Sequence, residues 1–297
     1  MRIITNGPVE LWTEEFGDPA HPPVLLIAGS MAQGVTWPDA LVGRLAAAGR
    51  RVIRYDHRDT GRSSALDFAA TPYTWADVKD DALAVLDGYG IDSAHIVGHS
   101  AGGILGQWIA AEHPERVRTL TVIASSPLGR GEGETFTRAL MGEPRRPHDL
   151  PYPRPELIEF FGKAAVNPPA PDRASLIDFQ IGLARVLHGT GLPFDEDGQR
   201  RQEERIFDRD RDPATVANHQ RAFAADPGFE PADALGRITA PTLAIEGTCE
   251  PAKPGHSALI AEAVPGAELL MVEGMGHGFP AEVHAGLADA IVSWTKR

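Results

Sequence analysis

The stretch His95–Trp108, "HIVGHSAGGILGQW", decides the fold of this chain. It places a single serine, Ser100, between two glycines, directly after an apolar run and directly before a helix-like segment. Glycine weakens both strands and helices, and serine contributes little to packing. A buried strand followed by a buried helix does not need this arrangement, so the pattern indicates a local geometry that serves something other than core packing.

Outward from this stretch, apolar segments with strand character alternate with helical patterns. We predict strands at 9–17, 22–29, 51–56, 94–98 and 117–125, and helices at 37–49, 74–90 and 104–114. Continuous apolar strands separated by helices are typical of a mostly parallel, twisted sheet that is covered by helices on both faces. The fold class predicted for the first half of the chain is therefore α/β.

The alternation is interrupted in the middle of the chain. From about Pro127 to Asp233 the pattern is helical, with a proline-rich segment at 142–155 that predicts an irregular loop. It then resumes, with strands predicted at 241–247 and 267–274 and helices at 256–264 and 281–294. The interruption is too long for a loop. We expect one core domain, residues 1–127 and 234–297, with residues 128–233 inserted as a helical cap.

The residues Gly98-His99-Ser100-Ala101-Gly102 match the G-x-S-x-G nucleophile elbow in its expected context of strand, sharp turn and helix. Because the two glycines lack a Cβ, strand and helix can crowd against the turn and hold the serine in an unfavourable backbone conformation. The following helix would direct its N-terminal N–H groups at the site, where an oxyanion would form. Ser100 is therefore the predicted nucleophile.

A nucleophilic serine needs a base, and the base needs an acid that orients it. In this fold the partners follow in the order serine, acid, histidine. His277, in a glycine-rich loop after the last predicted strand, is the predicted base. Glu250 follows the preceding strand and is the predicted acid, with Glu246 as the second candidate. The backbone N–H groups of Ser30 and Ala101 are the predicted oxyanion hole.

At these residues the chain resembles the α/β-hydrolase superfamily, and within it the aclacinomycin methylesterases of anthracycline biosynthesis. The similarity is carried by "ELWTEEFGDPA", "WPDALVGRLAAAGRRVIRYDHRDTGRSS", "DFAATPY", "AVLDGYGIDSAHIVG", "GTGLPFD" and "GMGH". It implies a Ser-Asp-His triad that removes a methyl group from a carboxylic ester of a tetracyclic aglycone, with no cofactor. The family's aspartate falls on Glu250, whose side chain is longer by about 1.5 Å, one C–C bond.

The predicted function is a serine carboxylic-ester hydrolase that acts through an acyl-enzyme on a bulky, polyketide-like ester, with a methyl ester preferred. Apolar and aromatic cap segments favour such a substrate, and Met31 and Trp37 beside the oxyanion loop are expected to form walls. One alternative is a lactone-opening esterase, since macrolide-inactivating esterases are similar in the elbow and early strands. Another is a non-catalytic binding protein, supported only by the unusual Glu250.

The composition of the chain limits its expected partners and its expected location. The chain has 297 residues with 28 basic and 41 acidic side chains, a formal charge of −13, which argues against nucleic acid as a partner. A single cysteine and the absence of a signal peptide or long apolar run favour a cytoplasmic protein without a membrane segment. We expect a small-molecule ester as partner and no metal, and a homo-oligomer is left open. The spacing of His95 and His99 does not favour zinc.

The segment Tyr55–Ser64, "YDHRDTGRSS", carries several charged residues and resembles a catalytic motif at first sight. We interpret it instead as a buried turn in which Asp56 and Arg58 brace neighbouring loops, because buried polar groups are normally satisfied by such hydrogen bonds.

Overall fold

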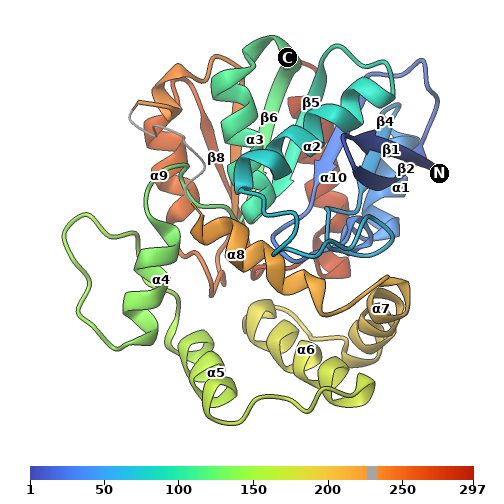
Figure 1. Ribbon diagram of the computed structural model, residues 1–297. Coiled ribbons are helices and arrows are strands. Elements are labelled where there is room, and N and C mark those ends of the chain that lie inside the picture. The colour runs from blue at the N-terminus through green and yellow to red at the C-terminus, as the bar shows by residue number, and fades with distance from the viewer. Residues whose placement is uncertain (226–232) are drawn as a thin grey trace.

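The computed structural model describes residues 1–225 and 233–297, and in these residues eight strands form one sheet in the order β1-β2-β4-β3-β5-β6-β7-β8 (Figure 1). The β1–β2 and β2–β4 pairs are antiparallel, and the remaining pairs are parallel. The predicted α/β sheet is confirmed. The strands are β1 (Arg2–Asn6), β2 (Val9–Phe16), β3 (Pro23–Ile27), β4 (Arg51–Tyr55), β5 (Ala94–His99), β6 (Val117–Ile123), β7 (Thr242–Gly247) and β8 (Glu268–Val272).

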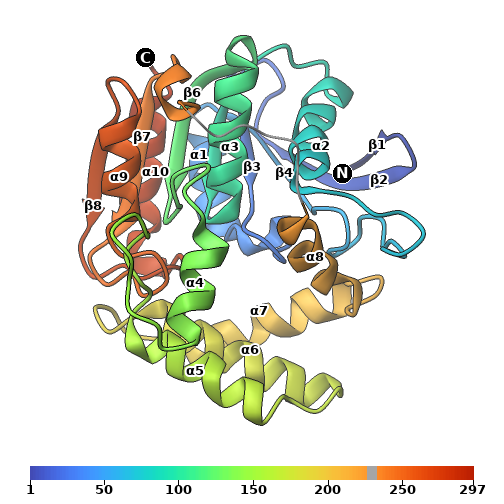
Figure 2. The same cartoon turned by 60° about the vertical axis from the view of Figure 1, so that its left-hand side comes forward.

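Helices cover both faces of this sheet. Those that follow or precede strands are α1 (Asp39–Ala47), α2 (Trp75–Gly88), α3 (Ala101–Glu112), α9 (His256–Ala263) and α10 (His284–Trp294). Helices α1 and α10 pack on one face, and α2, α3 and α9 on the other (Figures 1 and 2). No helix in the described ranges is both long and apolar enough to cross a lipid bilayer.

Strand β3 shows why the central strands read as unbroken apolar runs. Its side chains point alternately to the two faces, so that Leu25 and Ile27 join the cluster under α2 and α3, while Val24 and Leu26 join the cluster under α1 and α10. All four are completely buried. A strand covered on both faces needs apolar residues at every position, which is the pattern that predicted a parallel sheet.

Between β6 and β7 the described residues contain helices and loops but no strand, and the α-helices are α4 (Glu132–Leu140), α5 (Pro155–Val166), α6 (Arg173–His188), α7 (Glu196–Arg209) and α8 (Asn218–Ala224). They lie together over one end of the sheet (Figure 2). The proline-rich segment at 142–155 is largely irregular, as predicted. Residues 226–232 of the expected cap range lie outside the described residues.

Two features differ from the predicted elements. Strand β1 was not expected, because it lies at the edge of the sheet and only Ile4 among its residues is buried, which leaves a weak apolar pattern. Helix α3 begins at Ala101 and thus includes Gly102 and Gly103, where the propensity of glycine had favoured a later start. Tertiary packing at the elbow outweighs that local propensity.

The last turn of α7 is fastened to the sheet by a buried ion pair. Arg209 Nη2 lies 2.7 Å from Asp56 Oδ2, and its guanidinium covers the Trp12 ring at 4.2 Å from the centroid. The Asp56 carboxylate also accepts the backbone N–H of Gly34 and of Arg62, at 2.8 and 2.9 Å. The predicted bracing role of Asp56 is therefore confirmed.

Removing Arg209 should cost far more stability than removing an exposed arginine of the same helix. Arg209→Met leaves Asp56 buried without its counter-charge and should lower the free energy of unfolding by about 3–5 kcal/mol. Arg200→Met, which breaks the exposed pair with Asp178, should cost at most about 1 kcal/mol. Chemical denaturation of both variants beside the wild type measures the difference.

The loss in Arg209→Met should shrink as the pH falls. Burial already raises the pKa of Asp56 above its ordinary value, and Arg209 opposes this rise. Without Arg209 the folded state binds a proton at a pH where the unfolded state does not, so acidification through that folded-state pKa favours folding. An equal loss for the Arg209 and Arg200 variants, or a loss that grows on acidification, would contradict this account.

Candidate functional site

The turn between β5 and α3 holds Ser100 in the strained conformation that the sequence predicted. Its φ and ψ are 55° and −122°, a positive φ that non-glycine residues rarely adopt. The Ser100 N–H donates to the carbonyl of Ile123 at 2.9 Å, and the Ser125 hydroxyl donates to the Ser100 carbonyl at 2.7 Å. Both backbone polar groups of the serine are thus bound by β6 and the residues after it.

The glycines of the elbow leave no room for a side chain. A Cβ on Gly98 would overlap the backbone of Gly102, and a Cβ on Gly102 would overlap the backbone carbonyls of Ile27 and Ala28 at the end of β3. The strands and α3 therefore meet at backbone distance around the serine. This contact is the physical reason for the two glycines in the motif.

The imidazole of His277 and the carboxylate of Glu250 form a hydrogen-bonded pair. His277 Nδ1 lies 2.9 and 3.0 Å from the two carboxylate oxygens. Glu250 is only 1% exposed, and its Oε1 also accepts the backbone N–H groups of Ala252 and Lys253 at 2.7 and 3.1 Å. Burial would raise the pKa of Glu250, but the charge and hydrogen bond of His277 and these two amides outweigh it and hold that pKa below its ordinary value.

An ionised Glu250 accepts the Nδ1 proton, which leaves Nε2 of His277 as the nitrogen that can take up a proton. Glu246, the second candidate acid, lies elsewhere. Its carboxylate accepts the backbone N–H groups of Gly255 and Ser257 at 2.6 and 2.9 Å, at the start of α9. The structure therefore brings Glu250, and not Glu246, to the imidazole.

The loop that carries His277 is held from two sides. His99 Nε2 lies 2.7 Å from the His277 carbonyl, and burial together with the neighbouring His277 lowers the pKa of His99 to about 3. A neutral His99 thus donates from Nε2 and ties the base to the residue next to Ser100. From the other side, the His277 N–H donates to the carbonyl of Leu187, near the end of α6, at 2.7 Å.

Two segments that carry the family resemblance, "GTGLPFD" and "GMGH", lie against each other. A Cβ on Gly276 would overlap the His188 carbonyl, and a Cβ on Gly191 would overlap the backbone of Gly274. The sequence alone did not predict that these segments, which are about 80 residues apart, are in contact. Their shared richness in glycine was the one signal that two backbones approach closely.

The loop after β3 lies against the serine. A Cβ on Gly29 would be 3.2 Å from Ser100 Cβ. Among the described residues, neither the N–H of Ser30 nor that of Ala101 has a hydrogen-bond acceptor. Two unengaged amides at a helix N-terminus and a tight turn beside a serine are the arrangement that stabilises an oxyanion.

The two expected wall residues differ in exposure. Met31 is 39% exposed at the surface of the oxyanion loop. Trp37 is completely buried: its ring stacks on Phe279 at 4.9 Å and meets His99 edge-on at 6.2 Å. The expectation that Trp37 forms a substrate wall is therefore corrected, because its side chain supports the elbow from within the core.

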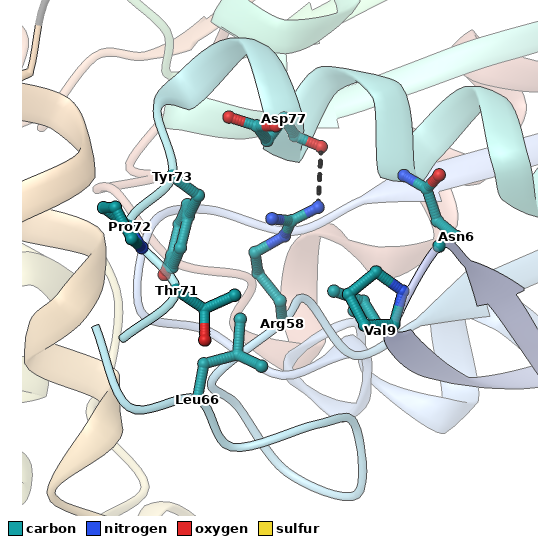
Figure 3. Close-up of a pocket in the computed structure, with 10 residues that line it drawn as sticks. Asn6, Val9, Arg58, Leu66, Thr71, Pro72, Tyr73 and Asp77 are labelled. Atoms are coloured by element: carbon teal, nitrogen blue, oxygen red, sulfur yellow. Dashed lines mark hydrogen bonds between the residues drawn. The ribbon is translucent and has the colours of Figure 1, made fainter. Parts of the chain in front are cut away.

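His95 and Arg58, which the sequence analysis also considered, both make contacts within the fold. His95 Nδ1 bonds Thr119 Oγ1 at 2.9 Å, so it does not share a partner with His99. Arg58 makes two hydrogen bonds to the buried carboxylate of Asp81, at 2.7 and 2.8 Å. Arg58 also lines a pocket of about 250 Å³ at the start of α2, where it donates to the Asp77 carbonyl (Figure 3). That pocket contains none of the predicted site residues.

Comparison with known proteins identifies the family. Residues 22–282 match the family model described as the alpha/beta hydrolase fold. The chain belongs to the α/β-hydrolase fold family. The resemblance to anthracycline methylesterases is also confirmed, since this hydrolase is 41% identical to the rhodomycin D methylesterase DnrP of Streptomyces peucetius over 99% of the chain and 98% of the relative. The counterpart DauP of Streptomyces sp. (strain C5) shows the same identity and coverage.

Solved structures share the fold of this hydrolase. An esterase from Exiguobacterium antarcticum aligns with a TM-score of 0.75 at 19% identity, covering 99% of each chain. The enol-lactonase from Burkholderia xenovorans LB400 aligns with a TM-score of 0.70 at 21% identity, covering 100% of each chain. At these identities the likeness concerns the fold alone.

Adding a methyl group inside the elbow should disrupt the site, whereas adding one on an exposed helix should not. In Gly98→Ala the Cβ meets backbone, so the turn must shift; we expect the free energy of unfolding to fall by about 1–3 kcal/mol or more. In Gly43→Ala, within α1, the Cβ meets no described atom within 4 Å, and the variant should gain about 0.5–1 kcal/mol. Thermal unfolding of both variants tests this, and a tolerated Gly98→Ala would contradict it.

Kinetic measurements on variants should distinguish the two candidate acids. Glu250→Gln presents an amide to Nδ1, favours the wrong tautomer of His277 and should lower kcat by about 10³- to 10⁴-fold. Glu246→Gln should leave kcat within about threefold and lower stability by about 1 kcal/mol, because only its contacts at the start of α9 weaken. Steady-state kinetics on an activated ester, with thermal unfolding as control, measures both; loss of turnover in Glu246→Gln alone would reverse the assignment.

Proposed function

We propose that this hydrolase cleaves carboxylic esters through an acyl-enzyme formed on Ser100. The observation that carries the proposal is the hydrogen-bonded pair of Glu250 and His277, which a bond from His99 ties to the strained serine turn. A buried carboxylate, an imidazole and a half-buried serine on a strained turn constitute the apparatus of acyl transfer.

In the proposed mechanism Ser100 Oγ attacks the ester carbonyl while Nε2 of His277 takes its proton. The ionised Glu250 orients the imidazole and stabilises its positive charge. The N–H groups of Ser30 and Ala101 bind the tetrahedral oxyanion, and each such donor is worth about 10²–10³ in turnover. His277 then protonates the departing alcohol, and water repeats the sequence on the acyl-enzyme and releases the acid.

For the substrate we propose a methyl ester on a bulky, largely apolar, polyketide-like acid. The two rhodomycin D methylesterases support this choice because their similarity extends over 99% of the chain. Residues 128–233 are proposed to form a cap domain over the core. Phe136, Phe161, Phe160 and Phe179 of this range pack in series, with neighbouring ring centroids 5.1–5.7 Å apart. All four are half-buried, so the cap helices present apolar aromatic surface.

The proposed reaction needs no cofactor, and its partner is the small-molecule ester. Met31 is proposed as a substrate contact because its side chain is exposed beside the oxyanion loop. The cytoplasmic location stays a prediction from the sequence. The oligomeric state stays open.

The proposal is tested on a panel of polycyclic methyl esters, aryl esters and macrolactones, with wild type beside Ser100→Ala. We expect equimolar acid and methanol from a methyl ester, and a loss of about 10⁴- to 10⁶-fold in Ser100→Ala. A product that gains one water and releases no alcohol would replace the methyl ester with a lactone. An organophosphonate should label wild type at Ser100 by intact mass, and absence of both labelling and turnover would indicate a binding protein.

A further inference from the structure

The loop that carries Ser30 forms a tight turn with an unusual residue in its third position. The Ala32 N–H donates to the Gly29 carbonyl at 3.3 Å, which closes a turn with Ser30 and Met31 at its centre. Met31 has a φ of 63°, whereas Ser30 is not among the residues with positive φ. Positive φ at this position alone is the mark of a type II turn, which favours glycine or asparagine there. Methionine does not supply this conformation by itself, so something else must hold the turn.

The group that holds it is His219, in the helix that returns the chain from the cap to the core. The Met31 N–H donates to His219 Nδ1 at 2.8 Å, and His219 Nε2 lies 2.8 Å from the Arg58 carbonyl. A carbonyl can only accept, so Nε2 carries the proton and Nδ1 is free to accept from Met31. The ring is completely buried and meets Trp75 and His57 edge-on at 5.5 and 5.8 Å.

The imidazole stays in this neutral tautomer down to acidic pH. Burial, with the neighbouring His57, lowers the pKa of His219 to about 3. The other end of the turn has a similar support, because His57 Nε2 lies 3.0 Å from the Ala28 carbonyl. Two buried imidazoles therefore bind backbone groups on either side of Ser30, the Met31 N–H and the Ala28 carbonyl.

We infer that His219 is a positioning residue that holds the Ser30 N–H in place for the oxyanion by accepting the N–H of Met31. The inference rests on the proposed function and adds to it a residue that does not touch the substrate. The peptide between Ser30 and Met31 is the one that rotates when a type II turn converts to type I. With this peptide bound to His219, the neighbouring amide is oriented before the substrate arrives, which is what oxyanion stabilisation requires.

Two near-isosteric variants separate the acceptor from the rest of the side chain. His219→Asn puts an amide oxygen where Nδ1 stands and keeps an acceptor for Met31. His219→Gln puts an amide nitrogen where Nε2 stands, which keeps the bond to Arg58 and removes the acceptor. We expect His219→Gln to lower kcat and the rate of Ser100 phosphonylation by about 10- to 100-fold with KM within about threefold, and His219→Asn to stay within about fivefold of wild type.

The control variant loosens the same helix without touching the turn. Asn218 clamps α8 through Asp59 and the Leu66 carbonyl, at 3.1 Å each. Asn218→Ala should lower Tm but leave kcat within about threefold. Equal kinetic losses in His219→Gln, His219→Asn and Asn218→Ala would overturn the inference, because helix docking alone would then explain the effect.

A rescue distinguishes positioning of the turn from a general structural role. Glycine adopts positive φ freely, so His219→Gln should lower the phosphonylation rate less in a Met31→Gly background than in the wild type. Met31→Gly alone is the reference, because Met31 is also a proposed substrate contact. An equal loss in both backgrounds would contradict the inference. Should His219→Gln fail to fold, a through-hydrogen-bond NMR coupling between the Met31 amide nitrogen and His219 Nδ1 in the wild type supports it, and a ring protonated at Nδ1 overturns it. If wild type itself shows no phosphonylation and no ester turnover, the proposed function fails, and the turn geometry is then judged by this coupling alone.

Discussion

The close approach of backbones around Ser100 is the constraint on which the rest of the site depends. Strand β3, strand β5 and helix α3 meet there without side chains between them, because Gly98 and Gly102 leave only backbone in the gap. Strand β6 accepts the serine N–H at Ile123. The strain of a positive φ persists only when the surroundings over-determine it, and here several elements of the sheet do so. The turn is then rigid enough for other groups to be arranged around it.

Residues between β6 and β7 bind the loops arranged around this turn, although they lie far from those loops in the chain. Leu187 accepts the N–H of His277, and Arg154 Nε donates to the Glu250 carbonyl at 3.0 Å. His219 accepts the N–H of Met31, and Arg209 pairs with Asp56. The helices between these strands thus do more than cover the end of the sheet. They supply hydrogen-bond partners to the base loop, the acid loop and the oxyanion loop.

The histidines near the site divide into a proton acceptor and fixed supports. His99 and His219 have pKa values lowered to about 3, chiefly by desolvation, and bond to backbone groups. His277 is also buried, but it bonds to an ionised carboxylate. An imidazole that is desolvated and has no anionic partner stays neutral and acts as a fixed donor or acceptor. An imidazole paired with Glu250 can take up a proton with its charge compensated, which suits a base.

The sequence alone predicted the sheet, its helical interruption and the elbow, because strand periodicity, helix periodicity and the spacing of Gly98, Ser100 and Gly102 are local properties. It also predicted His277 and Glu250, since chain order in this fold places the base and acid after particular strands. Only the tertiary structure showed that Glu250, and not Glu246, binds the imidazole. It also showed that Trp37 is buried behind the elbow and that His219 accepts the N–H of Met31. These depend on which distant backbone and side-chain atoms come within hydrogen-bond distance, and no local pattern of residues encodes that distance.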